Sequence, residues 1–459
     1  MVMQYPPLIK STLNMIVASF NFVKVTLTDA VRIVRSPKES LKQIYGVSFF
    51  RNAVYLIANS GVTLFLGFVF YIVIARFYSI SDVGLGSALL STWALLSFLG
   101  TLGFGYSIVR YLPASNNKPR LLNFFFTISG LATVVACLIF LGGLSWWSPK
   151  LTFIHEDPVF FTTFIIFVAA TTLNTVAIQA FVASRRSGFA LSQGIISSVL
   201  RLSLAIGLAS VFGVFGIIAS QGIAIIISLS VCLLLFLPRV LPTYRPFSTF
   251  RANETGGNSE LYSYSLANYT SEGLFSLPSW VLPLIILNIS GAEASAFFYM
   301  SWTMSTVLLA IGSGISSSLF AEGSYETKNI SRNLISSLKL IILLLIPAIV
   351  ILALLGDKFL LLYGRVYSTE GARLLQLLAV AALPASLNLI YLSLTRIERR
   401  LKNLLFVSSF MAVGTVALSC ILLPQMGIIS VGISWLIIQT ALLFITLPAI
   451  VRKIKNPGL

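Results

Sequence analysis

The sequence has little charge and few residues suited to catalysis or metal binding. Only 10 % of its 459 residues are charged, one histidine is present, and the three cysteines all lie inside apolar runs. An odd number of buried cysteines argues against a disulfide framework or a metal site. The sequence contains no phosphate-binding glycine loop, nucleophile elbow or Cys/His metal spacing, so we expect neither a metal nor a cofactor.

Acidic residues are also scarce. The chain contains 14 Asp and Glu and 31 Lys and Arg, which gives a net charge of +17. In a soluble protein this excess would suggest a nucleic-acid partner. Here the basic residues lie between apolar runs, which favours membrane topology and no nucleic acid. Residues Met1 to Tyr45 lack the short apolar core and small-residue cleavage site of a signal peptide.

The sequence is rich in long runs of hydrophobic residues. Hydrophobic residues make up 57 % of the chain, and the mean hydropathy is +0.93. An α-helix needs about 20 apolar residues to cross the hydrocarbon core of a membrane. Such runs predict an all-α polytopic membrane protein with twelve spans: 52–74, 85–109, 121–144, 160–183, 191–212, 214–237, 263–288, 294–320, 333–355, 371–394, 403–423 and 427–450.

The distribution of Lys and Arg predicts the orientation. With the N-terminus inside, basic residues favour the inner segments by roughly five to one, so we expect both termini in the cytoplasm. Before the first span, only thirteen residues separate Lys10 from Lys24, too few to cross a membrane. Residues 1–45 form either an amphipathic helix on the inner leaflet or a weakly ordered tail.

The chain contains an internal repeat. Asn59 to Ser107 aligns with Asn268 to Ser318, and a gapless second block follows. The second block places Arg185-Arg186 on Arg399-Arg400 and Gly213 on Gly427, at an offset of 214. Each copy has six spans, which is an even number, so both copies enter the membrane from the same side. The copies therefore form a parallel repeat. The predicted units are an N-terminal cytoplasmic segment (1–45), a six-helix lobe (46–237), a cytoplasmic linker (238–262) and a second six-helix lobe with a short basic tail (263–459).

Arg201 is the deepest predicted charge in the membrane. Gln193, Ser197 and Arg201 are spaced i, i+4, i+8, so they share one helix face. A guanidinium suits bidentate contact with phosphate oxygens, and an intramembrane charge is a functional hypothesis by default. The equivalent residue of the second lobe is Thr415, so the repeat does not require this charge. The alternative is a structural tie to helix carbonyls.

Glu272 is the only acid well inside a predicted span. It shares a polar stripe with Asn268, on a helix that also carries Pro278 and Pro283, which permit a bend. Glu272 could serve as the counter-ion of Arg201, a cation site or a proton carrier, or be a structural carboxylate. Asn268 and its repeat equivalent Asn59 are candidate cavity residues, although packing explains them equally well.

Both opening units show an apolar helix, a short loop with one acid, and a second helix rich in small residues. These halves, LGFVFYIVIARFYSISDVGLGS and LPLIILNISGAEASAFFYMS, resemble the Wzx-type polysaccharide flippases of the multidrug/oligosaccharidyl-lipid/polysaccharide exporter superfamily. The AFVASRRSGFA block is similar to that family as well. The resemblance implies two lobes in a V shape, as in MATE transporters, and alternating access to a central cavity. It also implies a lipid-linked oligosaccharide carried on a polyprenyl (pyro)phosphate.

The leading hypothesis is therefore a transporter, not an enzyme, that moves such a lipid to the outer leaflet of the plasma membrane. We expect a monomer, with membrane lipids and the lipid-linked sugar as partners and a proton or sodium ion for coupling. A drug/cation antiporter of the same superfamily is the first alternative, but no acid lies inside the first six spans. An integral-membrane glycosyltransferase or polymerase would need larger outer loops than the short ones expected here.

Overall fold

The computed structural model describes residues 48–115, 117–242, 244, 259–325 and 330–455, which are helical and contain no strand. The predicted segment 1–45 and most of the predicted linker 238–262 lie outside these residues. The first group of helices comprises α3 (Ser48–Phe77), α4 (Ile80–Thr101), α5 (Phe104–Tyr111), α6 (Lys118–Gly142), α7 (Leu144–Trp147), η1 (Pro149–Leu151), α8 (Phe153–Glu156), α9 (Pro158–Ala183), α10 (Ser187–Val231), η2 (Cys232–Phe236) and α11 (Leu237–Val240). The second comprises α12 (Ser259–Ser290), α13 (Ala292–Tyr325), α14 (Ile330–Leu360), α15 (Arg365–Ile397), α16 (Leu401–Met426) and α17 (Ile429–Lys455).

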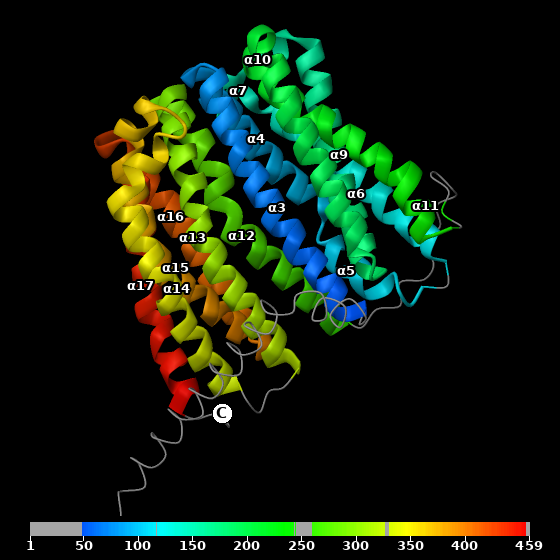
Figure 1. The fold of residues 1–459 in the computed structure, drawn as a ribbon, viewed down its shortest axis with the longest axis vertical. Coiled ribbons are helices and arrows are strands. Elements are labelled where there is room, and N and C mark those ends of the chain that lie inside the picture. Colours follow the sequence, from blue (N-terminus) through cyan, green and yellow to red (C-terminus); the bar gives the residue numbers. More distant parts are fainter. Residues whose placement is uncertain (1–47, 116, 243, 245–258, 326–329, 456–459) are drawn as a thin grey trace, which may run out of the picture.

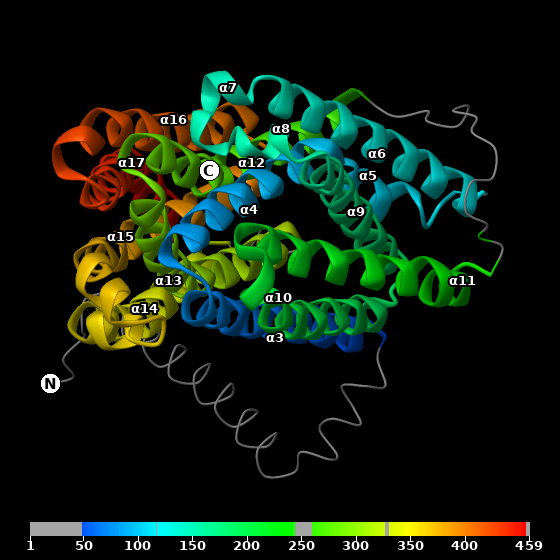
Figure 2. The ribbon, with the colours of Figure 1, turned by 90° about the horizontal axis from the view of Figure 1, so that it is seen from above.

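The prediction of a twelve-span all-α membrane fold is confirmed. Within the described residues, twelve helical segments are long and apolar enough to cross a bilayer. The first group and the second group form two lobes that lie side by side in Figure 1. Viewed from above, α4, α12 and α13 lie in the middle, because α4 packs against both α12 and α13 across the lobe boundary (Figure 2).

The repeat is visible in the backbone of the turns between spans. Arg185 and Arg399 both adopt left-handed conformations, with φ of 54° and 55°. Gly213 (φ 46°, ψ −130°) and Gly427 (φ 59°, ψ −151°) form the next pair of matching turns. L-residues seldom adopt positive φ, so two such matches at the same offset indicate a common supersecondary design.

The two copies differ in the second span of each lobe. The prediction of one continuous span over 85–109 is wrong: α4 ends at Thr101, and Leu102 and Gly103 have φ of 50° and 73° before α5 begins. In the second lobe, α13 continues as a helix through Gly314, the repeat equivalent of Gly103. The amphipathic α5 is therefore a feature of the first lobe alone.

The two ends of the helix bundle need neutral names. We call the end where α3 begins and α17 ends the Ser48 side, at the bottom of Figure 1. The opposite end, where α3 ends and α4 begins, is the Asp82 side. At the Asp82 side, Gly84 packs so closely on the first residue of α13 that a Cβ would overlap the Ala292 carbonyl. Small residues allow such backbone contact within a membrane, where packing drives helix association.

Further contacts close the lobes together at the Asp82 side. The Arg76 guanidinium donates to the carbonyls of Leu362 (2.9 Å) and Leu361 (2.7 Å) across the boundary. The Asn288 amide donates to the Trp147 carbonyl at 2.8 Å. One continuous apolar cluster joins the lobes here, with Phe70 and Ile74 from α3 and partners that include Phe297 and Met300 from α13, Tyr363 and Tyr367.

Tyr78 anchors the end of α3 inside the first lobe. Its hydroxyl donates to the Ala205 carbonyl at 2.8 Å. Burial, together with the nearby charge of Asp82, raises the pKa of Tyr78 to about 12, so the phenol keeps its proton at neutral pH. The α3–α10 contact that positions Arg201 is thereby fixed at its Asp82 end.

Candidate functional site

Arg201 lies deep in the first lobe and has no acidic partner among the described residues. It stands fourteen residues after the start of α10, about 21 Å along the helix axis. The guanidinium carbon lies 4.4 Å from the centre of the Phe70 ring, and one terminal nitrogen donates to Gln221 Oε1 at 2.9 Å. Its Nε atom is buried and has no hydrogen-bond partner in the described part of the chain. An aromatic face and a neutral amide therefore hold a charge that no carboxylate neutralises.

Glu272 does not neutralise Arg201 in this structure. Among the described residues, the ion pairs are those that Glu398 makes with Arg400 and Lys453. Glu272 is exposed on α12, and its carboxylate accepts a hydrogen bond from Tyr106 of α5 at 2.9 Å. The Arg201–Glu272 ion pair, one of the roles considered for Glu272, is not formed between these described residues, and the two charges belong to different lobes.

Glu272 lies beside a contact between the lobes on the Ser48 half of the bundle. One turn earlier, Tyr269 stacks on Phe98 of α4, with ring centres 4.4 Å apart and planes 11° apart. The Tyr269 hydroxyl donates to the Phe98 carbonyl at 2.9 Å. The Tyr106–Glu272 hydrogen bond and the Tyr269–Phe98 stack therefore join the two lobes on this half of the bundle.

A pair of tyrosines joins the lobes beside Arg201. The hydroxyls of Tyr71 (α3) and Tyr299 (α13) are 2.8 Å apart, and the ring centres are 5.3 Å apart at 62°. Both tyrosines lie within electrostatic range of the Arg201 guanidinium. The uncompensated charge is therefore next to the seam along which the lobes meet.

The seam between α3 and α13 is closed at the tyrosines and exposed towards the Ser48 side. On α3, Leu64 and Ser60 lie seven and eleven residues before Tyr71, and both are exposed. On α13, Ser313 and Ser317 lie fourteen and eighteen residues after Tyr299 and are also exposed. A helix turns by about 100° per residue, so the side chains on α3 point within about 40° of Tyr71 around the helix axis, and those on α13 within about 40° of Tyr299. The two faces that touch at the tyrosine pair thus carry exposed side chains further along.

Three polar candidates of the first lobe cluster where α10 meets its neighbours. Gln193 is 1 % exposed, and its amide donates to Asn174 Oδ1 of α9. Ser197 is half-buried one turn further along α10. The Asn59 Oδ1 atom is buried without a hydrogen-bond partner among the described residues, at a point where a Cβ on Gly194 would overlap it. In this conformation Gln193 is committed to packing within the lobe.

The structure divides the six candidates between the lobes. Arg201, Gln193, Ser197 and Asn59 share the α3–α10 layer, whereas Glu272 and the buried Asn268 lie on α12. Sequence reasoning missed Phe70, Gln221, Tyr71, Tyr299 and Tyr106. Aromatic residues in apolar runs carry no signal of their own, and Gln221 reaches Arg201 only because the chain reverses at Gly213.

Solved structures share this fold. A multidrug resistance MATE family transporter of the MOP superfamily, in an inward-facing conformation, aligns with a TM-score of 0.65 at 13 % identity, covering 88 % of this chain and 98 % of that one. The lipid II flippase MurJ, in an inward closed conformation, also gives 0.65 at 13 % identity, covering 88 % and 90 %. A MATE family transporter in an outward-facing conformation gives 0.60 at 13 % identity, covering 89 % and 96 %.

Sequence comparison identifies the family directly. No curated protein matches the chain significantly. A family model described as polysaccharide biosynthesis protein, however, matches residues 49–320, more than half of the chain and reaching from α3 into α13. That region contains Arg201, Glu272 and the tyrosine pair. The chain therefore belongs to the polysaccharide biosynthesis protein family and has the fold of the MATE and MurJ transporters.

Proposed function

We propose that this protein flips a lipid-linked oligosaccharide, carried on a polyprenyl (pyro)phosphate, from the cytoplasmic to the outer leaflet of the plasma membrane. The observation that carries the proposal is the Arg201 guanidinium, which lies next to the lobe seam and has no acidic partner in the part of the chain that the structure describes. That seam is closed at one end and exposed at the other. Two lobes that rock about such a seam give alternating access without covalent chemistry.

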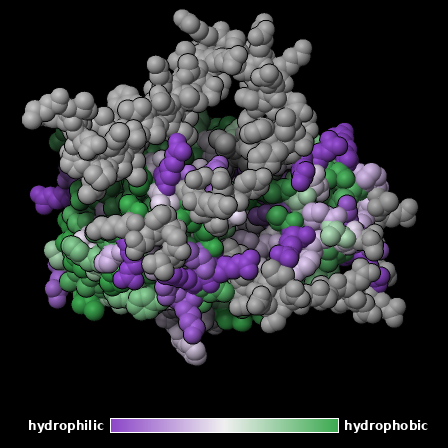
Figure 3. Space-filling view, turned by 90° about the horizontal axis from the view of Figure 1, so that it is seen from below, coloured by the Kyte–Doolittle hydropathy of each residue, from purple (hydrophilic) through white to green (hydrophobic). Residues whose placement is uncertain are grey.

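The Ser48 side is the cytoplasmic side in this proposal. Lys and Arg concentrate there, and Figure 3, which looks onto this face, shows hydrophilic side chains gathered across its centre. The described basic residues at this end include Arg110, Lys118, Arg120, Arg185, Arg186, Arg239, Arg332, Arg396, Arg399, Arg400, Lys402, Arg452 and Lys453. The positive-inside rule places such an end in the cytoplasm, with both termini on that side. The exposed half of the seam then opens to the leaflet on which the cargo is assembled.

Arg201 would hold the phosphate of the cargo. A guanidinium has five N–H donors in a planar fork, and in the described part of the chain one of them is engaged with Gln221. Desolvating a cation without an anion costs several kcal/mol, so a bound phosphate relieves a charge that the protein leaves uncompensated. The Phe70 ring lies against the guanidinium and limits its movement, which favours bidentate contact.

The moving parts would be the lobes 46–237 and 263–459, joined through the linker 238–262. Ser313 and Ser317 lie along the exposed half of the seam, and the Ser313 hydroxyl donates to the Ala310 carbonyl at 3.1 Å. Serine oxygens that line a wet path can also accept hydrogen bonds from water or a sugar. Glu272 would carry the coupling proton or sodium ion, since its hydrogen bond to Tyr106 joins the lobes. One chain contains both lobes, so a monomer suffices.

The test is complementation of surface-glycan assembly by Arg201 variants. Arg201→Ala is expected to reach the membrane and to lower export of lipid-linked sugar at least about tenfold, the loss of one charge-assisted contact. Arg201→Lys keeps the positive charge but loses the planar, bidentate donor geometry of the guanidinium, so it should be partly active. Thr415→Ala, at the equivalent position of the second lobe, is the control and should leave export unchanged. Full activity of Arg201→Ala at normal protein levels would exclude the phosphate contact.

A further inference from the structure

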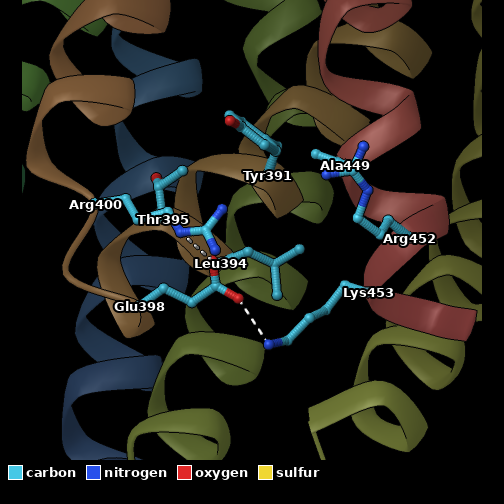
Figure 4. Close-up of a pocket in the computed structure, with 8 residues that line it drawn as sticks. All are labelled: Tyr391, Leu394, Thr395, Glu398, Arg400, Ala449, Arg452 and Lys453. Carbon is cyan, nitrogen blue, oxygen red and sulfur yellow. Dashed lines mark ion pairs between the residues drawn. The ribbon is translucent and has the colours of Figure 1, made fainter. Parts of the chain in front are cut away.

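The second lobe contains a cavity that no first-lobe residue lines. Its volume is about 190 Å³, and it lies between the end of α15 and the end of α17 at the Ser48 side (Figure 4). The lining residues are Tyr391, Leu394, Thr395, Glu398, Arg400, Ala449, Arg452 and Lys453. Since a water molecule occupies about 30 Å³ in the liquid, the cavity admits a group of several heavy atoms.

The charged groups around this cavity are mostly basic. Glu398 pairs with Lys453 at 2.8 Å and with Arg400 at 3.0 Å. Figure 4 shows these two cations reaching the carboxylate from different sides, while Arg452 extends towards Tyr391. Among the described residues Arg452 makes no ion pair. Three cations against one carboxylate leave the lining with a net charge of +2, which suits an anion.

The first lobe closes the equivalent position. By the repeat, Thr395 corresponds to Phe181 and Glu398 to Ser184. Phe181 is fully buried and packs on Phe189, with ring centres 5.7 Å apart. Both lobes have the left-handed arginine and a second arginine in this turn, but where the second lobe has Thr395 and Glu398 the first has the buried Phe181 and Ser184. The helix–turn–helix design therefore does not by itself require the cavity.

The depth of the cavity limits what the anion can be. The candidate membrane spans on either side end at Ile397 and Ile454, so the Glu398–Arg400 turn and Lys453 lie at the Ser48 ends of these spans. Basic residues at the ends of spans are placed to meet lipid headgroups. Leu394, Ala449 and the Tyr391 ring add an apolar wall. A phosphate with an attached acyl-glycerol matches this combination of cations at the interface and an apolar wall beside them.

We propose that this cavity binds the phosphate of an anionic membrane phospholipid. Arg452 makes the first contact, and Arg400 and Lys453 turn from Glu398 to the lipid phosphate. Glu398 holds the two cations in place when the site is empty and competes with the incoming anion. The site is separate from Arg201 and does not depend on what the protein transports.

The test measures lipid binding to the purified full-length protein after delipidation, by native mass spectrometry. The probes are dioleoyl phosphatidylglycerol, dioleoyl phosphatidylcholine and inorganic phosphate. We expect one tight phosphatidylglycerol site, weakened about fivefold for each charge removed in Arg400→Ala/Arg452→Ala. The matched control is Arg185→Ala/Arg186→Ala, which removes two charges from the turn of the first lobe and should leave this site intact.

Two further variants separate the site from a general basic surface. Thr395→Phe, which copies the first lobe, should abolish tight binding without a change of charge. Glu398→Gln removes the competing carboxylate and should tighten binding severalfold, provided that its thermal midpoint shows a folded protein. Equal weakening by both double variants, or wild-type binding by Thr395→Phe, would overturn the proposal. Binding of inorganic phosphate without a response to phosphatidylglycerol would make the ligand a soluble phosphate and overturn the lipid assignment.

Discussion

The two lobes share their turns and differ in their chemistry. Arg185 and Arg399 have the same backbone conformation to within 1° in φ, so the repeat preserves how the chain enters the fifth span of each lobe. Sixteen residues further along, one lobe carries the deep cation Arg201 and the other the fully buried Thr415. Turn geometry is thus a property of the fold, whereas the intramembrane charge belongs to one lobe. This asymmetry directs attention to the first lobe for cargo contact.

Moving the charge to the second lobe should have the largest effect. Thr415→Arg buries a guanidinium at a site that is 0 % exposed, without the counterparts of Phe70 and Gln221. We expect destabilisation of about 3 kcal/mol or more, because an uncompensated buried charge is costly. Protein yield and thermal midpoint in detergent measure it. Thr415→Val is the size-matched control and should stay within about 1 kcal/mol of wild type, since the Thr415 hydroxyl has no hydrogen-bond partner among the described residues.

The paired glycines of the second spans should respond with opposite signs. Gly103 has a φ of 73°, and a Cβ there would lie 3.1 Å from the Tyr269 ring, so Gly103→Ala should cost about 1–2 kcal/mol. Gly314 lies within α13 with nothing within 4 Å of an added Cβ. Gly314→Ala should therefore stabilise by about 0.5–1 kcal/mol. The thermal midpoints of the two variants provide the comparison, and equal shifts would contradict the structural difference between the lobes.

Loss of one hydroxyl at the tyrosine pair should shift the balance between closed and open seams. Tyr71→Phe removes the hydrogen bond to Tyr299, which is worth about 1 kcal/mol. Spin labels at Glu156 and Lys358, one on each lobe at the Asp82 side, should show a longer-distance population. Because both hydroxyls make the same bond, adding Tyr299→Phe should produce little further change. Additive shifts would mean that the hydroxyls act through other partners.

The smallest effect is expected at the matching arginines. Arg185→Gly and Arg399→Gly each relieve a left-handed conformation that costs an L-residue about 1 kcal/mol. The gain is partly offset by the greater freedom of glycine in the unfolded chain. The two variants should change the thermal midpoint slightly and by the same amount. A marked difference between the two thermal midpoints would show that the left-handed conformation has a different free-energy cost in the two turns.

Hydropathy and the repeat predicted the spans and the turns because these depend on local sequence. Apolar length marks each span, and positive-φ turns recur at Gly213 and Gly427. The break at Leu102 was not predictable, since leucine favours a helix and the left-handed conformation is imposed by packing around Gly103. The depth of Arg201 followed from helix rise alone.

The partners of Arg201 depend on the arrangement of whole helices. Phe70 comes from α3, and Gln221 lies beyond the reversal of α10 at Gly213. The tyrosine pair joins residues 228 positions apart, and neither residue differs in type from the aromatic residues that merely pack. Such contacts require the docking of one lobe on the other, which a periodic sequence pattern does not encode.

The tyrosine pair also determines which part of the molecule can respond to voltage. Its two hydroxyls are neutral and lie in an apolar cluster, so their separation moves no charge through the membrane potential. One elementary charge that crosses 100 mV is worth about 2.3 kcal/mol, and the pair gains none of it. Arg76, which also donates across the lobe boundary, lies at the Asp82 end, where little of the potential falls. Opening of the tyrosine pair is therefore insensitive to the electric field, and a field-driven cycle would act on charges inside the membrane, such as Arg201, or on the anionic cargo proposed above.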